Sequence, residues 1–215
     1  MIRCVVFDFD GTLVLSNDIK REGFMRLARH FEQGPVLMAA ILGCPSGDRE
    51  AILKRFASDI GESHVAASLV TTYNHTVREQ IVACPERPGA AGLLCDLRRK
   101  GMHVFVNSAT PQDELRLTLE ERYPAGTFDG VYGGFGRKLV NLHAIAKAAD
   151  VPACDMAMIG DGTDDADAAA KFGCRFIAIA DGSLDRRLPS ASLLTNLTTI
   201  SRLLGLEQQS LESIS

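Results

Sequence analysis

The sequence predicts an α/β fold with a parallel β-sheet and an inserted helical domain. Three observations support this prediction: short apolar runs recur along the chain, helical patterns alternate with them, and residues 16–84 show helical spacing alone. Alternating strands and helices are typical of parallel sheets, in which crossover helices connect the strands. A helical segment of this length between two such strands is most simply an insertion into an α/β domain.

The predicted strands are short runs of β-branched and other apolar residues. Such runs suit strands that are buried on both faces of a sheet. They cover residues 2–7, 102–107, 155–160 and 174–180, and residues 128–134 are a weaker candidate for a further short strand.

Helical patterns separate these strands. They cover residues 111–122, residues 138–149 and a segment that follows Asp164 and ends near Gly173. For the first of these helices we expect Thr110 as the N-cap and Pro111 at the first helical position, where the missing N–H of proline leaves no hydrogen bond unmade.

Residues 16–84 are expected to form a helical domain of their own. Apolar residues recur there at three- and four-residue intervals, which is typical of helices with one buried face. They are Phe24, Leu27, Ala28 and Phe31, then Ile52, Phe56 and Ile60, and then Val65, Leu69, Tyr73 and Val77. Residues 1–15 and 85–205 then form the α/β core, and we expect the polar segment 206–215 to be a flexible tail.

The composition excludes several classes of protein. A formal net charge of −4 gives no general attraction to nucleic acid or to anionic lipid. We expect a cytoplasmic protein without a membrane partner, because no uncharged apolar run approaches the roughly 18 residues that a spanning helix needs and no signal-peptide pattern is present. The 6 cysteines form no CxxC pair and most lie among apolar residues, so buried reduced thiols are expected.

Carboxylates and a hydroxyl occur where the predicted strands end. Asp8 and Asp10 follow the first strand, Ser108 follows the second, and Asp161, Asp164 and Asp165 follow the strand at 155–160. In open α/β sheets, ligands bind beyond the carboxyl ends of the strands. The sequence therefore predicts that these side chains meet at one edge of the sheet.

A gathering of carboxylates implies a cation. Two carboxylates about 4 Å apart repel each other by roughly 4 kcal/mol at an effective dielectric constant near 20. Oxygen ligands select a hard ion, and Mg²⁺ accepts one or two carboxylates together with waters and a phosphate. Taken singly, Asp-Gly and Gly-Asp-Gly are also ordinary turn sequences, so the prediction depends on several motifs together.

Four motifs occur in order along the chain. They are Asp8-Phe9-Asp10-Gly11-Thr12, Val106-Asn107-Ser108, Lys138 within residues 136–142, and Gly160-Asp161-Gly162-Thr163-Asp164-Asp165. Through them the chain resembles the haloacid dehalogenase superfamily, in the phosphatase branch of phosphoglycolate phosphatase and β-phosphoglucomutase. The resemblance covers nearly the whole chain, and it implies a Rossmann-like parallel sheet core with residues 16–84 as an inserted α-helical cap domain.

The resemblance also implies catalytic roles. Asp8 is the nucleophile that forms an aspartyl-phosphate, which divides one difficult hydrolysis into two easier steps. Asp10 lies among other anions, which favours its protonated form, and it donates a proton to the leaving oxygen and then activates water. Ser108 donates a hydrogen bond to the phosphoryl oxygens and Lys138 neutralises their charge. Two alternatives stay open: Lys138 with Arg137 as a solvated helix start, and Ser108 as a plain N-cap.

The implied metal ligands and substrate contacts come from the same motifs. The Mg²⁺ ligands are Asp8, the backbone carbonyl of Asp10, Asp161 and one of the two acids at 164 and 165, where the spacing favours Asp165. The implied substrate-binding residues are Gly11, Thr12, Asn107, Ser108, Ala109, Lys138 and, from the first helix of the cap, Lys20. An exposed helix lysine is an equally good interpretation of Lys20.

The function implied is that of a Mg²⁺-dependent phosphatase that acts on a small phosphorylated metabolite, such as a sugar phosphate or a phosphoglycolate-like acid. Two alternatives share the motifs: a phosphomutase of the same fold, and a catalytically silent protein that binds a phosphorylated ligand. Dehalogenase activity is disfavoured because dehalogenating relatives generally lack an acid at the position of Asp10. Both a monomer and a homodimer are compatible with the sequence.

Overall fold

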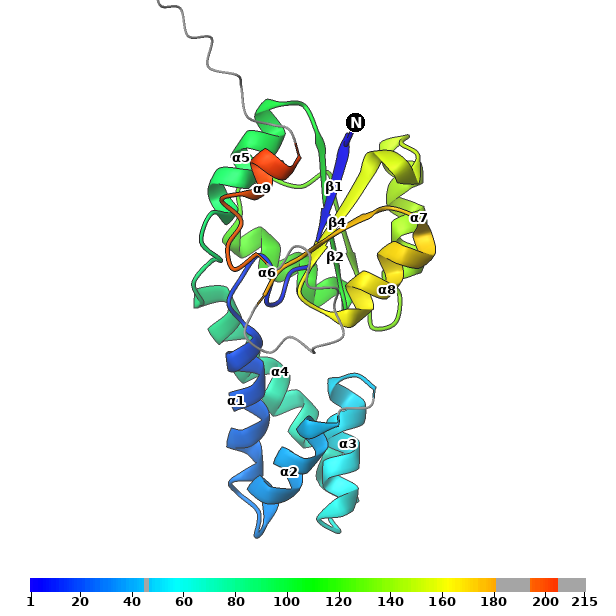
Figure 1. Cartoon of the computed structure of the whole chain (residues 1–215). Coiled ribbons are helices and arrows are strands. Elements are labelled where there is room, and N and C mark those ends of the chain that lie inside the picture. The colour runs from blue at the N-terminus through cyan, green and yellow to red at the C-terminus, as the bar shows by residue number, and fades with distance from the viewer. Residues whose placement is uncertain (45–46, 181–193, 205–215) are drawn as a thin grey trace, which may run out of the picture. The chain divides into compact units, whose positions relative to one another are not determined.

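The structure is a computed structural model that describes residues 1–44, 47–180 and 194–204 (Figure 1). The chain divides into two compact units, Met1–Leu15 with Glu86–Ser215 and, between them in the sequence, Ser16–Pro85. The role of the second unit as a cap domain stays a prediction. The tail expected to be flexible at 206–215 lies outside the described residues, as does residue 205 of the expected core.

The first unit contains a five-stranded parallel sheet. The strands are β1 (Cys4–Phe7), β2 (His103–Ser108), β3 (Gly130–Gly133), β4 (Met156–Gly160) and β5 (Arg175–Ala178). Their order is β3-β2-β1-β4-β5, and every neighbouring pair is parallel. The predicted α/β fold class is confirmed. Each predicted apolar run coincides with one of these strands, although β2 extends one residue beyond the predicted run at 102–107, to Ser108.

Strand β1 lies at the centre of the sheet, which decides where the site forms. Phe7 pairs with Val106 of β2 on one side and with Ile159 of β4 on the other. The residues that follow β1 are therefore flanked by those that follow β2 and β4. All four residues of β1 are fully buried, which explains why this strand contains only apolar side chains.

Helices cover both faces of the sheet. They are α5 (Ala90–Arg99), α6 (Gln112–Arg122), α7 (Lys138–Ala149), α8 (Thr163–Phe172) and α9 (Ile200–Leu203). A 3₁₀ turn, Ala153–Asp155, precedes β4. In Figure 1, α5 and α9 lie on one face and α7 and α8 on the other. Alternate residues of β1, Cys4 and Val6, pack with Leu142 and Ile145 of α7 in one apolar core.

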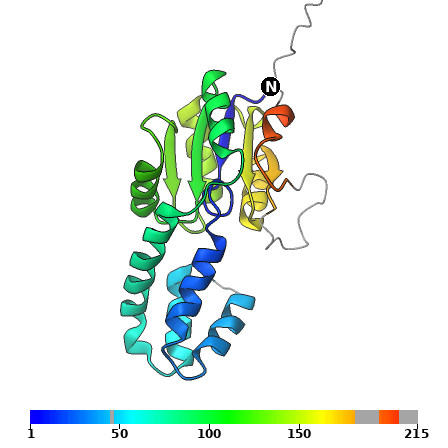
Figure 2. The same cartoon turned by 90° about the vertical axis from the view of Figure 1, so that its left-hand side faces the viewer.

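The second unit is helical, as the spacing of its apolar residues predicts (Figure 2). It contains α1 (Asn17–Ala28), α2 (Gly34–Gly43), α3 (Arg49–Asp59) and α4 (Ala66–Ala83), with a 3₁₀ turn at Ser63–Val65. Phe24 of α1 stacks on Tyr73 of α4 with ring centroids 4.3 Å apart. Gly23 permits this approach, since a Cβ atom there would lie 2.5 Å from the Val77 side chain.

Three sequence expectations need correction or a narrower statement. The N-cap of α6 is Pro111 rather than Thr110, because Pro111 has extended backbone and the helix begins at Gln112. The cysteines are free thiols, but Cys44, Cys95 and Cys154 are exposed rather than buried: Cys44 is the C-cap of α2, Cys154 lies in the 3₁₀ turn before β4, and Cys95 lies on α5. Among the described residues, none of the helices combines the length and the apolar character needed to cross a bilayer.

Candidate active site

The loop after β1 places Asp8 and Asp10 at the carboxyl edge of the sheet. The backbone N–H of Asp8 donates to the carbonyl of Ile159 at 2.8 Å, so Asp8 is still attached to the sheet. The chain then turns, and the N–H of Leu13 donates to the carbonyl of Phe9 at 2.9 Å. Gly11 has φ of 76° in this turn, a conformation that favours glycine.

Arg87 supports the same loop from the residues that follow the helical unit. Its side chain is buried, and its guanidinium donates to the carbonyls of Gly11, Thr12, Ala180 and Thr195. The planar guanidinium has five N–H donors in a fixed arrangement, which suits a group of carbonyls from separate segments. Arg87 therefore connects the backbone that directly follows Asp10 with Ala180 and Thr195, which lie beyond the end of β5.

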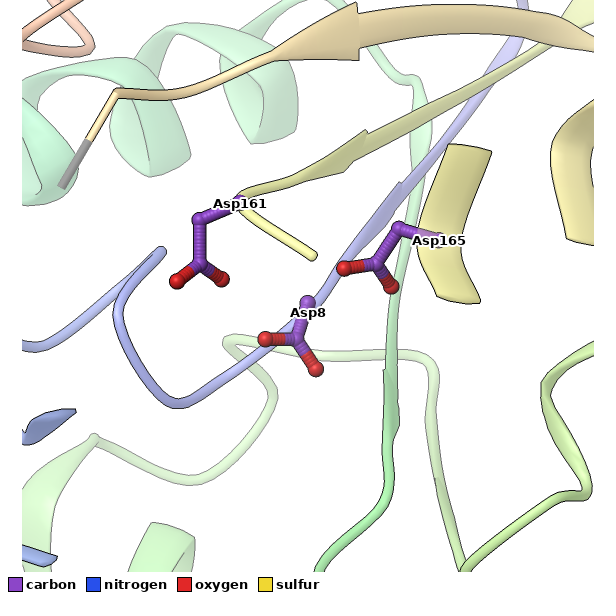
Figure 3. Close-up of side chains that lie close together, drawn as sticks. All are labelled: Asp8, Asp161 and Asp165. Atoms are coloured by element: carbon purple, nitrogen blue, oxygen red, sulfur yellow. The ribbon is translucent and has the colours of Figure 1, made fainter. Parts of the chain in front are cut away.

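Three carboxylates meet at this edge (Figure 3). Asp8 follows β1, Asp161 follows β4 and Asp165 lies in the first turn of α8, and one oxygen of each lies within 4.8 Å of the others. Asp161 Oδ1 also accepts a hydrogen bond from Thr12 Oγ1 at 3.0 Å. A set of closely spaced oxygen donors on partly buried side chains fits a hard divalent cation.

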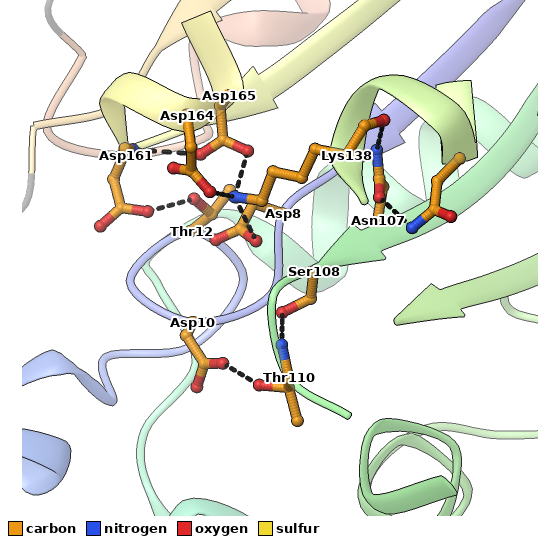
Figure 4. A network of polar contacts seen from close by, with 12 residues as sticks. Asp8, Asp10, Thr12, Asn107, Ser108, Thr110, Lys138, Asp161, Asp164 and Asp165 are labelled. Atoms are coloured by element: carbon orange, nitrogen blue, oxygen red, sulfur yellow. Dashed lines mark hydrogen bonds and ion pairs between the residues drawn. The ribbon is translucent and has the colours of Figure 1, made fainter. Parts of the chain in front are cut away.

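Lys138 places a positive charge within this cluster (Figure 4). Its Nζ lies 2.5 Å from Asp165 Oδ1, 2.9 Å from Asp164 Oδ2 and 3.2 Å from Asp8 Oδ1. Burial favours the neutral amine, but the attraction of these three carboxylates outweighs it and holds the pKa of Lys138 well above its usual value. Lys138 is therefore a buried ammonium, which excludes the alternative of a solvated helix start.

Asp165 is the most deeply buried member of the cluster. Its Oδ1 faces Lys138, and its Oδ2 accepts from the backbone N–H of Gly162 at 3.1 Å. Burial and the nearby Asp8 carboxylate raise the pKa of Asp165, although Lys138 opposes the shift. Gly160 is required here, because a Cβ atom at that position would lie 2.4 Å from the Asp165 carboxyl group. Direct binding of a metal ion by Asp165 stays a prediction, since both of its oxygens already contact protein donors.

Two buried asparagines fix the start of α7, and with it Lys138. The side-chain amide of Asn107, in β2, donates to the backbone carbonyl of Lys138 at 3.0 Å. The amide of Asn141 in turn donates to Asn107 Oδ1 at 2.9 Å. Because the Asn107 side chain is directed toward α7, its position supports a role in orienting Lys138, and its expected substrate contact stays a prediction.

The hydroxyl of Thr110 contacts Asp10 on the other side of the loop. Thr110 Oγ1 donates to Asp10 Oδ2 at 2.7 Å, and Ser108 Oγ accepts from the backbone N–H of Thr110 at 3.2 Å (Figure 4). Ser108 is almost fully buried at the end of β2 and lies three residues before the N-cap of α6, Pro111. The alternative of Ser108 as the N-cap of that helix is therefore wrong.

The structure brings most of the predicted site residues to one edge of the sheet. Gly11, Thr12 and Ala109 belong to the two loops that carry Asp8, Asp10 and Ser108, whereas Lys20 lies on α1 in the helical unit. The expected substrate contacts stay predictions for all of these residues: Gly11, Thr12, Ser108, Ala109, Lys138 and Lys20.

Sequence reasoning missed three residues that hold this site together: Arg87, Thr110 and Asn141. Thr110 was expected to cap a helix, and Arg87 resembles a surface residue between Glu86 and Pro88. Asn141 had one available signal, since an amide three residues after Lys138 lies on the same helix face. Only the long-range partners of these side chains identify their roles.

The chain and its fold are similar to those of known proteins. Residues 5–179 match the sequence family described as haloacid dehalogenase-like hydrolase, which confirms the resemblance predicted from the four motifs. No curated protein matches the sequence. A variant of CbbY from Rhodobacter sphaeroides, in complex with xylulose-(1,5)bisphosphate, is 18% identical with a TM-score of 0.73, over 97% of this chain and 100% of that chain.

Two further solved structures have the same fold. A predicted phosphoglycolate phosphatase from Haemophilus somnus is 14% identical with a TM-score of 0.73, over 94% of this chain and 97% of that chain. β-Phosphoglucomutase from Clostridium difficile is 16% identical with a TM-score of 0.63, over 84% of this chain and 85% of that chain. At these identities the likeness concerns the fold alone.

Proposed function

Since the chain belongs to the haloacid dehalogenase-like hydrolase family, we propose that it is a Mg²⁺-dependent phosphatase of a small phosphorylated metabolite, such as a sugar phosphate or a phosphoglycolate-like acid. The observation that carries the proposal is the surroundings of Asp8. This buried carboxylate lies 3.2 Å from the Lys138 ammonium and next to the carboxylates of Asp161 and Asp165. A nucleophile for phosphorus needs such a positive charge beside it, because the phosphoryl group is itself an anion.

The residues present fit Mg²⁺. Asp8 and Asp161, together with the backbone carbonyl of Asp10, would hold the ion, and Asp165 is a further candidate ligand. When bound, Mg²⁺ supplies positive charge that stabilises the phosphoryl oxygens during transfer. The Lys138 ammonium already offsets part of the mutual repulsion of the carboxylates, so the site can fold before it binds an ion.

In the proposed first step, Asp8 attacks the phosphorus atom of the phosphate ester. A bond forms between a carboxylate oxygen of Asp8 and phosphorus, and the bond from phosphorus to the ester oxygen breaks. Asp10 donates its proton to that oxygen, which leaves as an alcohol. Lys138 and the Ser108 hydroxyl stabilise the charge on the remaining phosphoryl oxygens.

In the proposed second step, a water molecule hydrolyses the aspartyl-phosphate. Asp10, now a carboxylate, accepts a proton from the water as its oxygen attacks phosphorus, and the bond to Asp8 breaks. Inorganic phosphate leaves, Asp8 is regenerated as a carboxylate, and Asp10 again carries a proton. One residue therefore serves as the acid in the first step and as the base in the second.

Phosphate release from a panel of sugar phosphates, phosphoglycolate and nucleotides tests this proposal. The wild-type protein and Asp8→Asn are assayed with Mg²⁺ and with EDTA. We expect release that needs Mg²⁺ and is lost in Asp8→Asn, and the ranking of substrates identifies the substrate class. Conversion of one sugar phosphate into its isomer would instead indicate a phosphomutase. Ligand binding without release would indicate a catalytically silent protein, and either result would contradict the phosphatase.

A further inference from the structure

We propose that Thr110 is a positioning residue for Asp10: its hydroxyl holds the carboxyl group so that Oδ1 carries the proton exchanged with the substrate. The inference rests on the proposed function, in which Asp10 is the general acid and base. Its starting point is the hydrogen bond of 2.7 Å from Thr110 Oγ1 to Asp10 Oδ2, between loops that are 100 residues apart in the sequence (Figure 4).

Thr110 is itself held in place by its backbone. Its N–H donates to Ser108 Oγ at 3.2 Å, and its carbonyl accepts from the N–H of Gly134 at 2.9 Å. The packing against the end of β3 is tight, because a Cβ atom on Gly133 would lie 2.6 Å from the Thr110 carbonyl oxygen. The hydroxyl is therefore presented to Asp10 from a backbone that neighbouring strands fix on both sides.

The Thr110 hydroxyl is available for this purpose because α6 does not use it. The N-cap of that helix is Pro111, whose side chain has no hydrogen-bonding group, and the helix begins at Gln112. Asp113 and Glu114 provide favourable negative charge in its first turn instead. A threonine hydroxyl has a single proton to donate, and here that proton is directed at Asp10.

Asp10 needs such a restraint in order to work as an acid and a base. The final torsion of an aspartate side chain is broad, so its backbone does not decide which oxygen faces the substrate. A donor on Oδ2 keeps that oxygen as an acceptor both when Asp10 is ionised and when it is protonated. The proton then resides on Oδ1, passes to the ester oxygen in the first step and is replaced from water in the second.

The dependence of rate on the leaving group tests this role. An alkyl phosphate, for which we take the best sugar phosphate or phosphoglycolate of the panel, needs a proton on its leaving oxygen. p-Nitrophenyl phosphate instead has a leaving group that departs readily without one. We would measure kcat/KM with Mg²⁺ for both esters, because this constant reports the steps up to the first irreversible one and excludes hydrolysis of the intermediate that both esters share. The variants are Thr110→Val, which removes the donor, and Thr110→Ser, which retains it.

A matched control comes from α6, the helix that follows Thr110. Thr118 of α6 is buried, and its Oγ1 donates to the carbonyl of Glu114 at 2.8 Å. Thr118→Val therefore removes a similar hydrogen bond away from Asp10. Any general loosening of α6 or loss of folded protein would affect both esters equally in this control.

We expect Thr110→Val to lower kcat/KM for the alkyl phosphate by about 10- to 100-fold, a part of the usual contribution of a general acid. For p-nitrophenyl phosphate we expect a loss of less than about threefold, and Thr110→Ser should restore the alkyl phosphate to within about threefold of the wild type. In an Asp10→Asn background, Thr110→Val should add no further loss for either ester.

Any other result would contradict either the role of Thr110 or the proposed function. Equal losses for the two esters in Thr110→Val, or a failure of Thr110→Ser to restore activity, would overturn the role of Thr110 and leave the proposed phosphatase intact. A wild-type protein that releases phosphate from no member of the substrate panel would refute the proposed function itself, and the inference about Thr110 with it.

Discussion

Carboxyl groups at the two edges of the same sheet have pKa values that are shifted in opposite directions. At the carboxyl edge, Asp165 is buried beside Asp8 and its pKa is raised. At the amino edge, Asp129 directly precedes β3. Burial raises its pKa, but the hydrogen bonds from the Val104 N–H at 2.8 Å and from Arg98 at 2.6 Å, with the charge of Arg98, together outweigh burial and lower it. His103 lies next to the same carboxylate at 3.4 Å.

This difference indicates that the acid at the amino edge stabilises the fold, whereas the acids at the carboxyl edge belong to the candidate site. The acid at the amino edge has a cation and an N–H donor of its own, so its ionised form stabilises the folded chain. The acids at the carboxyl edge share one ammonium, so their mutual repulsion is retained in the folded state until a further cation binds. An edge that holds unfavourable charge in this way is typical of a functional site.

The largest effect on activity is expected from Asp8→Asn, at the carboxyl edge. Loss of the nucleophile should lower kcat by at least about a thousandfold. Because the substitution also removes one of the crowded charges, the free energy of unfolding in EDTA should stay the same or rise. Phosphate release and urea unfolding of one preparation check both statements. Activity within tenfold of the wild type would rule out Asp8 as the nucleophile.

Lys138→Met should affect both activity and stability. The loss of a charge that stabilises the phosphoryl oxygens should lower kcat by about 100- to 1000-fold. The carboxylates of Asp8 and Asp165 would remain buried without their cation, so the free energy of unfolding in EDTA should fall by about 3–5 kcal/mol.

Mg²⁺ provides the control for that prediction. Urea unfolding of Lys138→Met with Mg²⁺ should recover part of the lost stability, because an ion that binds only the folded chain stabilises it. Unfolding curves of Lys138→Met that coincide with those of the wild type in EDTA would contradict the view that the carboxyl edge depends on this ammonium.

An intermediate effect is expected from Asn141→Leu, which tests the support of the carboxyl edge. The substitution leaves Asn107 Oδ1 without its donor in a buried position, at a cost of about 1–3 kcal/mol in the free energy of unfolding. A displaced Lys138 should lower kcat by about tenfold or more, since small errors in placement reduce catalysis strongly. If kcat stays unchanged while stability falls, Asn141 supports the fold without positioning Lys138.

The smallest effect is expected from Asp129→Asn, at the amino edge. At pH 7 the free energy of unfolding should fall by about 1 kcal/mol, with activity unchanged. Since the folded pKa of Asp129 is lowered, its stabilising effect is fully present above the unfolded value near 3.9 and is lost as the pH falls through the folded value. The difference between the variant and the wild type in urea unfolding should therefore narrow as the pH is lowered from 7 to below the unfolded value of about 3.9. A constant difference over this range would show that the charge of Asp129 does not stabilise the fold.

Local sequence patterns were enough to predict the strands and most of the acidic cluster. The apolar run before Asp8 and the Gly160–Asp165 motif after β4 each place their carboxylates by short-range geometry, because a parallel sheet aligns the carboxyl ends of its strands. The start of α6 was predicted wrongly by one residue, since the preference of threonine for an N-cap competed with a longer-range bond to Asp10.

The sequence by itself determined the α/β alternation, the helical segment at 16–84 and the acidic residues that follow β1 and β4. These depend on periodicity and on neighbours within a few positions, which are present in the chain before it folds. Tertiary structure alone decided that the Thr110 hydroxyl bonds to Asp10, that Asn141 and Asn107 form a hydrogen-bonded chain to the Lys138 carbonyl, and that the Arg87 side chain is buried against backbone carbonyls. Each of these contacts joins residues 31 to 108 positions apart, and only the packing of strands and helices selects such partners among many polar side chains of the same type.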